Sequence, residues 1–436
     1  MPPKSIQTVI NTLEAHGFSA YAVGGCVRDT LLHTTPHDWD ICSNAPAETV
    51  MQLFEQVIPT GIKHGTVTVM MDAEAVEVTT FRTESGYQDH RHPAKVEFVQ
   101  TLEEDLKRRD FTINAMCFAA NGSVIDLYGG QEDLKNHLIR CVGDPDHRFK
   151  EDALRMLRAM RFASTLGFSI EKKTGDAIHR NKELLQFVSK ERIQMELSKM
   201  LVGKNIEEVL LCFTPIITEI IPELWNCLGF PQHSVWHNYD VWTHMVKTVS
   251  GSEPILEVRL AALLHDIAKP QCFQMDEDGH GHFHGHGPQG AVIADDILRR
   301  LRFDNQTREH VVWLIKTHDT RLAADKKTVA KWVSKYGEEA FLHFLMLRYA
   351  DIMAQSDHER EPRIAKIKKL YEIYLEVVEE HQALTLKDMD INGHDLLKLG
   401  YKGPELGKKL QELLDLVLEE KLKNQHETLL EYCKKI

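Results

Sequence analysis

Apolar residues in the first 125 positions follow both helical and strand spacing. Residues 4–18 place apolar side chains three and four positions apart, which predicts an amphipathic helix. Short alternating or β-branched runs follow in the stretches SAYAVGG, DWDICS, GTVTVMM and AVEVTTFR. Such runs are typical of strands, and CVRDTLLH, between the first two, has helical spacing. This segment is therefore predicted to be a mixed α/β head with a small sheet.

The pattern becomes helical almost throughout from about Gln131. Prolines and glycines divide it into separate helices, namely at Pro145, Gly167, Pro215 and Pro222. In the tail, residues 391–425 predict two charged helices around the turn KGPELG. The predicted fold class is α+β, in which a small N-terminal head with a sheet precedes an all-α neck and body, a helical domain and a helical tail.

The length and composition restrict the class of protein. A chain of 436 residues is too long for one ordinary core and predicts two to four domains. Its apolar runs fall short of the ~18 residues of a membrane span, so no membrane partner is expected. The first residues lack the pattern of a secretory signal, and the eight cysteines lack CxxC spacing. These features predict a cytoplasmic protein with buried thiols rather than disulfides.

The charge distribution leaves room for a nucleic-acid surface. The net charge of −13 argues against a protein that coats nucleic acid without selection. Residues 95–199 nevertheless carry 18 Lys or Arg against 17 Asp or Glu, so the acidic excess lies elsewhere. This middle segment is compatible with a surface that faces phosphates.

Residues 21–43 combine two adjacent glycines with two aspartates one residue apart. On a strand, Asp38 and Asp40 would present both carboxylates to one face. Mg²⁺ prefers such oxygen ligands together with substrate phosphates, and Gly24 and Gly25 would let backbone N–H groups approach those phosphates. The combination predicts a nucleoside-triphosphate site for metal-assisted nucleotidyl transfer. The alternative is a simple turn with helix-capping aspartates. Glu77 is either a third carboxylate of this site or a solvent-facing strand residue.

EDALRMLRAMRF is expected to form a helix on which charged residues recur every three positions, among residues that are otherwise almost all apolar. They are Asp152, Arg155, Arg158 and Arg161. Internal ion pairs would explain them. Recognition of a base would also explain them, because cytosine and adenine both present an exocyclic amine beside a ring-nitrogen acceptor. A carboxylate with a guanidinium would then accept C and A and reject U and G.

Five motifs in order, over about residues 20–200, carry a family resemblance. AVGGCVRD, DWDI, RRDFTINAM, DLYGGQEDL and EDALRMLRAMRFASTLGF resemble the class II CCA-adding tRNA nucleotidyltransferases and bacterial poly(A) polymerases, as does INGHDLLKLGYKGPELG in the tail. The resemblance implies untemplated addition of C, C and A to tRNA from CTP and ATP, with release of pyrophosphate. It implies triphosphate contacts at Gly24, Gly25, Arg28 and Asp29, Mg²⁺ ligands at Asp38 and Asp40 beside Glu77, ribose contacts at Arg109 and Asp110 with Asn114 nearby, and base contacts at Asp152 and Arg155 on the segment that also carries Arg158 and Arg161.

One further stretch bears on the subtype. TFRTESGYQDHRHPAKVEF resembles the flexible loop that CCA-adding and A-adding members keep and CC-adding members lack. Addition of CC alone is therefore disfavoured. An A-adding enzyme and a poly(A) polymerase of the same family remain alternatives.

A histidine-rich region at about residues 230–355 resembles the HD metal-dependent phosphohydrolases. Its motifs are VWTHM, AALLHDIAKP, HGHGPQG, IKTHD and LRYADI. The expected ligands of one or two Mn²⁺, Ni²⁺ or Co²⁺ ions are His244, His265, Asp266, His286, His318 and Asp351. His280, His282 and His284 are expected to be loop residues.

These interpretations give a four-part organisation. Residues 1–140 form the nucleotidyltransferase head, 141–225 the neck and body, 226–355 the HD domain and 356–436 a tRNA-binding tail. The main hypothesis is a tRNA nucleotidyltransferase whose HD domain is an accessory phosphohydrolase for 3′ ends. The alternative is a nucleotide phosphohydrolase with a regulatory head. The sequence leaves the oligomeric state open.

Overall fold

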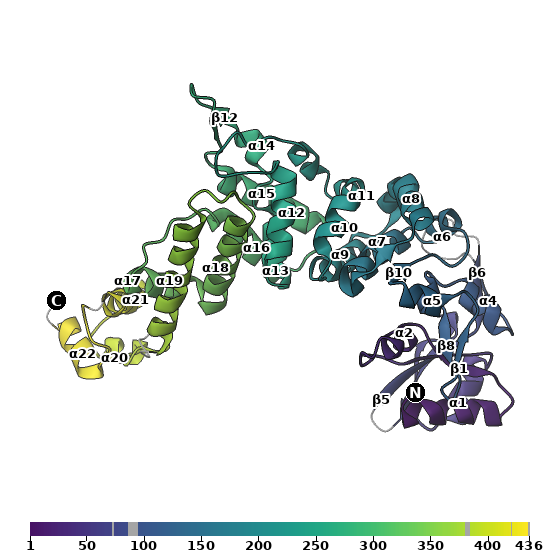
Figure 1. The fold of residues 1–436 in the computed structure, drawn as a ribbon. Coiled ribbons are helices and arrows are strands. Elements are labelled where there is room, and N and C mark those ends of the chain that lie inside the picture. The colour runs from purple at the N-terminus through teal and green to yellow at the C-terminus, as the bar shows by residue number, and fades with distance from the viewer. Residues whose placement is uncertain (72–73, 86–94, 380–383, 420, 435–436) are drawn as a thin grey trace. The chain divides into compact units, whose positions relative to one another are not determined.

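The computed structural model describes residues 1–71, 74–85, 95–379, 384–419 and 421–434. These residues form two compact units, Met1–Pro222 (unit 1) and Glu223–Ile436 (unit 2) (Figure 1). The finer division at residues 140, 225 and 355 remains a prediction. The centre of the expected flexible loop, residues 86–94, lies outside the described residues.

Unit 1 contains a seven-stranded sheet in the order β3-β4-β5-β2-β1-β8-β9. Its strands are β1 (Ala20–Val23), β2 (Asp40–Ser43), β3 (Val57–Gly61), β4 (Thr66–Met71), β5 (Glu74–Thr80), β8 (Met116–Phe118) and β9 (Val124–Asp126). Strands β2 and β5 pair in parallel, and the other neighbours pair antiparallel. The four predicted runs are confirmed as β1, β2, β4 and β5. Strand β8 gave no signal because it has three residues and all are buried, which removes the alternation.

Helices flank the sheet and continue beyond it. The first group is α1 (Lys4–Ala15), α2 (Gly25–Leu31), α3 (Ala47–Leu53), α4 (Leu102–Lys107) and α5 (Gly130–Lys135). The second group is α6 (Pro145–Glu151), α7 (Leu154–Phe162), α8 (Lys172–Asn181), α9 (Lys190–Leu201), α10 (Ile206–Cys212) and α11 (Thr214–Ile220). Two short strand pairs complete unit 1, namely β6 (Arg82–Ser85) with β7 (Lys95–Phe98) and β10 (Leu138–Ile139) with β11 (Ser169–Ile170). The expected amphipathic N-terminal helix is confirmed by α1, whose apolar face is buried.

Unit 2 is helical apart from the hairpin of β12 (Gln274–Met275) and β13 (Gly281–His282). Its helices are α12 (Val241–Gly251), α13 (Leu256–Leu264), α14 (Lys269–Cys272), α15 (His286–Arg300), α16 (Asn305–Thr317), α17 (Lys326–Tyr336), α18 (Glu338–Met353), α19 (Arg360–Glu379), α20 (Gly393–Lys398), α21 (Pro404–Leu418) and α22 (His426–Lys434). The two helices expected within residues 391–425 are confirmed as α20 and α21, and α22 follows that stretch. Pro404 starts α21 within the expected turn, since proline suits a first helical turn.

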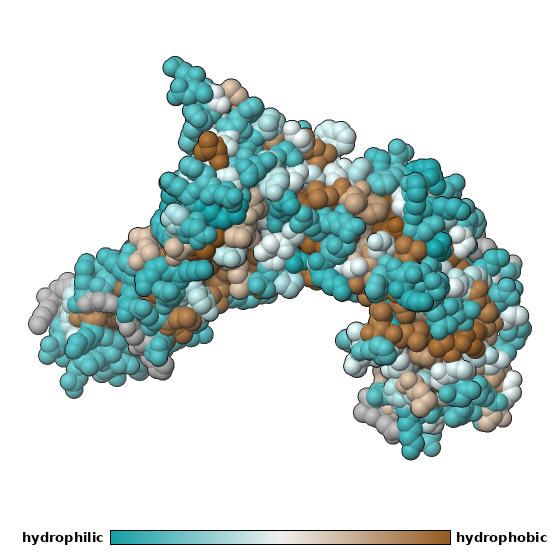
Figure 2. Space-filling model, in the orientation of Figure 1, coloured by the Kyte–Doolittle hydropathy of each residue, from teal (hydrophilic) through white to brown (hydrophobic). Residues whose placement is uncertain are grey.

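The state of the cysteines agrees in part with the expectations. The cysteines are free and mostly buried. The prediction of buried thiols was wrong at Cys212, which is exposed, and at Cys272, which is half-buried. Among the described residues, none of the helices is both long and apolar enough to cross a membrane. On the face drawn in Figure 2, hydrophilic residues cover most of unit 2, including the β12–β13 hairpin.

Candidate active sites

Two carboxylates share a face of the sheet where β2 and β5 begin to pair, and a third, that of Asp38, lies just before β2. Asp40 opens β2, and its partner in the parallel register is Glu77 of β5, so both side chains share one face of the sheet. Asp38 lies two residues before Asp40, and its carboxylate contacts Nδ1 of His37 at 2.8 Å. Burial, followed by the charge of Glu77, raises the pKa of Asp40. Mutual repulsion among oxygen ligands is relieved by a divalent cation, so this donor set fits Mg²⁺.

The glycine turn places an arginine beside these carboxylates. Gly24 has a φ of +88° and caps α2, a conformation that L side chains rarely adopt. A Cβ at Gly24 would stand 3.2 Å from Nη1 of Arg109, whereas one at Gly25 would make an ordinary contact with Arg28. The charge of Arg109 acts in the opposite direction and partly offsets the rise in the pKa of Asp40. The Nε of Arg109 is buried with no hydrogen-bond partner among the described residues. Glycine is therefore needed at position 24, where the Arg109 guanidinium lies close to a backbone turn that carries no side chain.

A hydrogen-bonded chain connects this turn to helix α7. Arg28 pairs with Asp29 at 2.7 Å and donates from Nη1 to Oδ1 of Asn114 at 2.8 Å. Asn114 donates to Oδ1 of Asp110 at 3.1 Å. Arg158 donates from Nε to the other oxygen of Asp110 at 2.8 Å. Although burial opposes ionisation, Arg158 and Asn114 lower the pKa of Asp110 to about 2. One hydrogen-bonded network thus joins five predicted residues, namely Arg28, Asp29, Asn114, Asp110 and Arg158.

Asp152 lies between two helices rather than on α7. It ends α6, and its backbone is extended, so the expectation of four charges on one helix was wrong for this residue. Its carboxylate accepts hydrogen bonds from Arg192 of α9 at 2.8 and 3.2 Å, and from the backbone N–H of Leu154. Sequence reasoning missed Arg192. Its position on a partly apolar helix was the only signal.

The arginines of α7 are directed to partners within unit 1. Arg155 is 8% exposed, and it donates to Glu151 at 2.7 Å and to the carbonyl of Arg108 at 2.8 Å. Arg161 donates to Glu196 at 2.5 Å. Arg155 therefore lies one turn from Asp152, but its guanidinium contacts Glu151 and backbone carbonyls. The two glutamates were not predicted, although Glu151 directly precedes Asp152.

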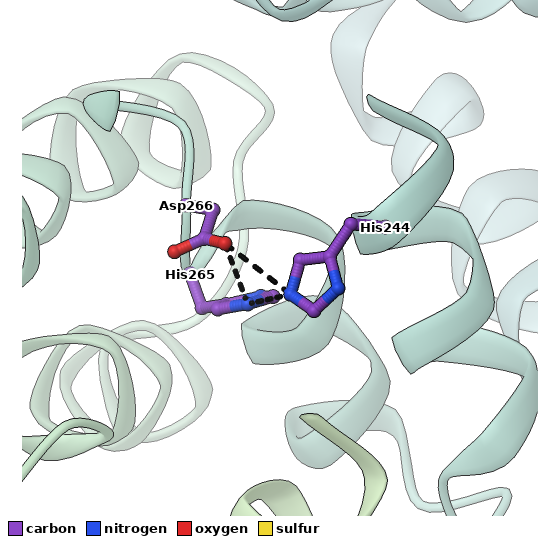
Figure 3. A group of neighbouring side chains, drawn as sticks. All are labelled: His244, His265 and Asp266. Carbon is purple, nitrogen blue, oxygen red and sulfur yellow. Dashed lines mark hydrogen bonds and ion pairs between the residues drawn. The ribbon is translucent and has the colours of Figure 1, made fainter. Parts of the chain in front are cut away.

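Unit 2 brings its expected metal ligands together. Figure 3 shows His244 from α12 facing His265 and Asp266, which follow α13. Nε2 of His244 is 3.2 Å from Nε2 of His265 and 3.3 Å from Oδ2 of Asp266. Oδ1 of Asp351, on α18, lies 3.2 Å from the same His244 nitrogen. The ligand atoms of His244, His265 and Asp266 are close enough to hold one cation, and Asp351 borders this group.

A second ligand group shares Asp266. Its other oxygen, Oδ1, lies 3.4 Å from Nε2 of His286 and 3.8 Å from Nε2 of His318. The two histidine nitrogens are 3.1 Å apart. One carboxylate thus offers an oxygen to each group, which is the arrangement that two metal ions with a bridging ligand require.

The four histidine rings are oriented by the backbone. In each ring Nδ1 contacts a main-chain carbonyl oxygen, and Nε2 faces the cluster; the carbonyls belong to Ala354, Ala262, Phe283 and Ile315. Such contacts fix the tautomer that leaves Nε2 free for a metal. Burial and the neighbouring charge of His265 lower the pKa of His318 to about 3. The donor set fits a transition-metal ion.

The Gly- and His-rich stretch before His286 contains three more histidines, His280, His282 and His284, and Lys269 lies beside Asp266. His282 is in strand β13 and contacts Asp276 at 2.8 Å, so the expectation of a loop residue was wrong there, while His280 and His284 lie outside the strands. Lys269 was missed, although it follows Asp266 by one helical turn. Its Nζ is 2.7 Å from Oδ2 of Asp266.

Three models of known protein families match this chain, and together they cover parts of both units. The family models that match are the Poly A polymerase head domain at residues 20–140, the probable RNA and SrmB-binding site of polymerase A at 167–228, and the putative domain 2 of tRNA nucleotidyltransferases at 290–433. The chain is 38% identical to a CCA-adding enzyme of Lactobacillus helveticus, over 97% of this chain and 95% of the relative. It is 35% identical to one of Enterococcus faecalis, over 99% and 96%. The crystal structure of the Bacillus stearothermophilus CCA-adding enzyme with CTP matches with a TM-score of 0.72 at 29% identity, covering 100% of this chain and 98% of that one.

Proposed function

Because this chain belongs to the family of CCA-adding enzymes, we propose that it adds C, C and A to the 3′ end of tRNA from CTP and ATP. The reaction uses no nucleic-acid template and releases pyrophosphate. The observation that carries the proposal is the register of Asp40 against Glu77, beside the turn at Gly24. It places oxygen ligands next to a bare backbone turn and an arginine, the combination that a metal-bound triphosphate requires.

Each part of the head has a role in this reaction. Asp38 and Asp40, with Glu77 beside them, would hold Mg²⁺, which when bound supplies charge neutralisation and polarises phosphoryl oxygens. Arg109 and the backbone at Gly24 bind the triphosphate. The network through Arg28, Asp29, Asn114 and Asp110 keeps the turn and helix α7 in register around the nucleotide.

Selection of C and A is assigned to Asp152 and Arg155. The carboxylate accepts from the exocyclic amine and the guanidinium donates to the ring nitrogen, a pair of contacts that U and G cannot satisfy. Arg192 orients the Asp152 carboxylate through its two hydrogen bonds. The support is that both residues lie where α6 meets α7, Asp152 at the end of α6 and Arg155 in the first turn of α7. A base would have to compete with Glu151 for the Arg155 guanidinium.

The test is incorporation of labelled CTP and ATP into tRNA that lacks its 3′ CCA, resolved nucleotide by nucleotide. The wild type should add three nucleotides and stop. Asp40→Ala should abolish addition of both nucleotides while tRNA binding persists, and Asp176→Ala, an exposed residue of the same unit, is the control. Addition of A only to tRNA ending in CC, or long A tails on unrelated RNA, would identify the A-adding or poly(A) alternative. Loss of one nucleotide only in Asp40→Ala would contradict the metal assignment.

Unit 2 supports a second activity, a metal-dependent phosphohydrolase. The specific observation is the bridging position of Asp266 between two buried ligand groups. Mn²⁺, Ni²⁺ or Co²⁺ would occupy it, and when bound would supply a nucleophilic water near neutral pH. Asp266→Ala should lose bound metal, measured by mass spectrometry, together with hydrolysis of p-nitrophenyl phosphate, and should keep nucleotide addition. Asp276→Ala, on the exposed hairpin, is the control. Loss of nucleotide addition in folded Asp266→Ala would contradict the independence of the two sites.

A further inference from the structure

Two histidines of unit 2 outside the histidine–aspartate cluster have their rings in contact. Nε2 of His310, on α16, lies 3.0 Å from Nδ1 of His343, on α18, and the ring planes meet at 88°. Neither residue belongs to the ligand groups of the cluster. Each precedes a cluster ligand along its own helix, His318 or Asp351, by about two helical turns, which is roughly 12 Å. The pair is therefore a separate group of metal-ligating side chains.

The distance between these two nitrogens suits a shared metal ion. Zn²⁺ binds imidazole nitrogens at about 2.0–2.1 Å, so two of them in a tetrahedral site stand roughly 3.3 Å apart. The histidine–aspartate cluster of the same unit has this spacing, because its two pairs of histidine Nε2 atoms are 3.1 and 3.2 Å apart. An ion between His310 and His343 would replace their direct contact with only a small displacement of either side chain.

The environment keeps both imidazoles in the neutral form that binds metal. His343 is 6% exposed, and His310 is half-buried. Burial lowers the pKa of each ring, and the charge of His343 lowers that of His310 further. Ligation requires a nitrogen without a proton. At neutral pH neither ring has to lose a proton to bind an ion, and only the ring that donates to the other has to change its tautomer.

Two glutamates near this pair offer oxygen ligands and negative charge. Glu339 precedes His343 by one turn of α18, so the two side chains share one face of that helix. Glu257 lies in the first turn of α13, which packs against both α16 and α18. The charges of both glutamates raise the pKa of both imidazoles, in opposition to burial. In the part of the chain that the structure describes, neither carboxylate forms an ion pair. Both are therefore available to a cation.

We propose that His310, His343 and Glu339 bind one Zn²⁺ ion, with Glu257 as the fourth ligand. Glu339 is exposed and Glu257 is half-buried, so both side chains can turn toward the ion without repacking the core. Four protein ligands are typical of a structural zinc site, since a catalytic one keeps an open position. The ion would join α13, α16 and α18, and each of these helices carries or leads into a ligand of the histidine–aspartate cluster. The inference does not rest on either proposed activity.

The first test measures zinc binding by the full chain after a chelator has removed its metal. Asp266→Ala is the background, because it lacks the bridging ligand of the cluster. Zn²⁺ is titrated against a chromophoric chelator. His310→Gln and His343→Gln should each remove one equivalent of bound Zn²⁺, and Glu339→Gln should weaken that equivalent about tenfold, as expected for one charge-assisted contact. His394→Gln, at an exposed histidine of α20, is the matched control. Equal zinc content in the histidine variants and the control would overturn the inference.

The second test distinguishes a metal site from a hydrogen bond between the two rings alone. In the same background, hydrogen exchange of peptides from α16 and α18 is followed with and without Zn²⁺. An ion at about a hundred times its dissociation constant should slow exchange through unfolding up to about a hundredfold, and His310→Gln should abolish this effect. If His310→Gln instead speeds exchange equally with and without Zn²⁺, the rings only bond each other and the proposal is overturned. Protection by Zn²⁺ that persists in His310→Gln would place the ion elsewhere and overturn it too. Glu339→Gln, at an exposed position, serves if a histidine variant fails to fold.

Discussion

The buried ion pair between Asp110 and Arg158 is expected to stabilise unit 1, and Asp110→Asn should remove that stabilisation. Asp110 is 8% exposed, and its Oδ2 accepts from two nitrogens of Arg158 at 2.7 and 2.8 Å. Against the effect of burial, Arg158 and Asn114 lower its pKa from 3.8 to about 2. Because a tenfold change in a protonation equilibrium corresponds to about 1.4 kcal/mol, the ionised carboxylate contributes on the order of 2.5 kcal/mol to the free energy of unfolding at neutral pH.

The pH dependence of this contribution has a defined sign. The folded-state pKa of Asp110 lies below the unfolded-state value, so the stabilisation is present above pH 3.8 and is lost as the pH falls through about 2. Roughly half of it remains at pH 3. The difference in unfolding free energy between wild type and Asp110→Asn should therefore be largest at pH 7. Urea-dependent hydrogen exchange of peptides from unit 1 measures it without interference from unit 2.

A matched variant and a cycle make the test specific. Asp176→Asn, on α8 of the same unit, removes an exposed carboxylate paired with Lys172 and should leave the unfolding free energy nearly unchanged, because solvent screens that ion pair. A double-mutant cycle with Arg158→Met should give a coupling energy on the order of 2 kcal/mol. If Asp110→Asn is as stable as Asp176→Asn but has lost nucleotide addition, the reasoning is refuted and Asp110 acts through the nucleotide.

Three further predictions concern the nucleotide site. Gly24→Ala should lower kcat/KM for CTP and ATP alike by at least about tenfold, because the positive φ is strained by roughly 1–3 kcal/mol and the added Cβ displaces Arg109; unchanged kinetics would exclude a close approach there. Arg155→Ala should lower the ratio of kcat/KM between CTP and UTP by roughly 5- to 150-fold, from ~1–3 kcal/mol for one base contact; an unchanged ratio with a lower melting temperature would make Arg155 an anchor only. Arg192→Met should raise KM for CTP and ATP about tenfold, with a smaller effect on the melting temperature, since it frees the Asp152 carboxylate; steady-state kinetics beside a melting curve decide.

The sequence alone determined features that depend on local spacing. Alternation located β1, β2, β4 and β5, because successive side chains on a strand point to opposite faces whatever the strand pairs with. The same alternation in DWDI predicted Asp38 and Asp40 on one face of a strand, but β2 begins at Asp40 and Asp38 lies before it. Six ligands in unit 2 were predicted from the family resemblance of five motifs, and only the adjacent pair His265 and Asp266 also stands out on an otherwise apolar helix. Those inferences needed only a few neighbouring residues.

The tertiary structure decided which distant groups meet. Glu77 had two interpretations until the parallel pairing of β2 with β5 set it opposite Asp40. Arg155 and Asp152 were expected as a pair, but the ends of α6 and α7 separate them, and packing of α9 supplies Arg192 to the aspartate. Many Asp, Glu, Arg and Lys residues could form ion pairs, and sequence spacing cannot choose among partners on different helices.

The same reason explains the cavity of unit 2. A cavity of about 710 Å³ there is lined by the segment after α16 and by α18 and α19; Arg348 lies in the LRYADI motif, but no motif marks Arg321 or Arg363. Local periodicity tells which side of a helix is buried, but not which other helix covers it. The charged residues that line this cavity therefore meet only once the helices have packed.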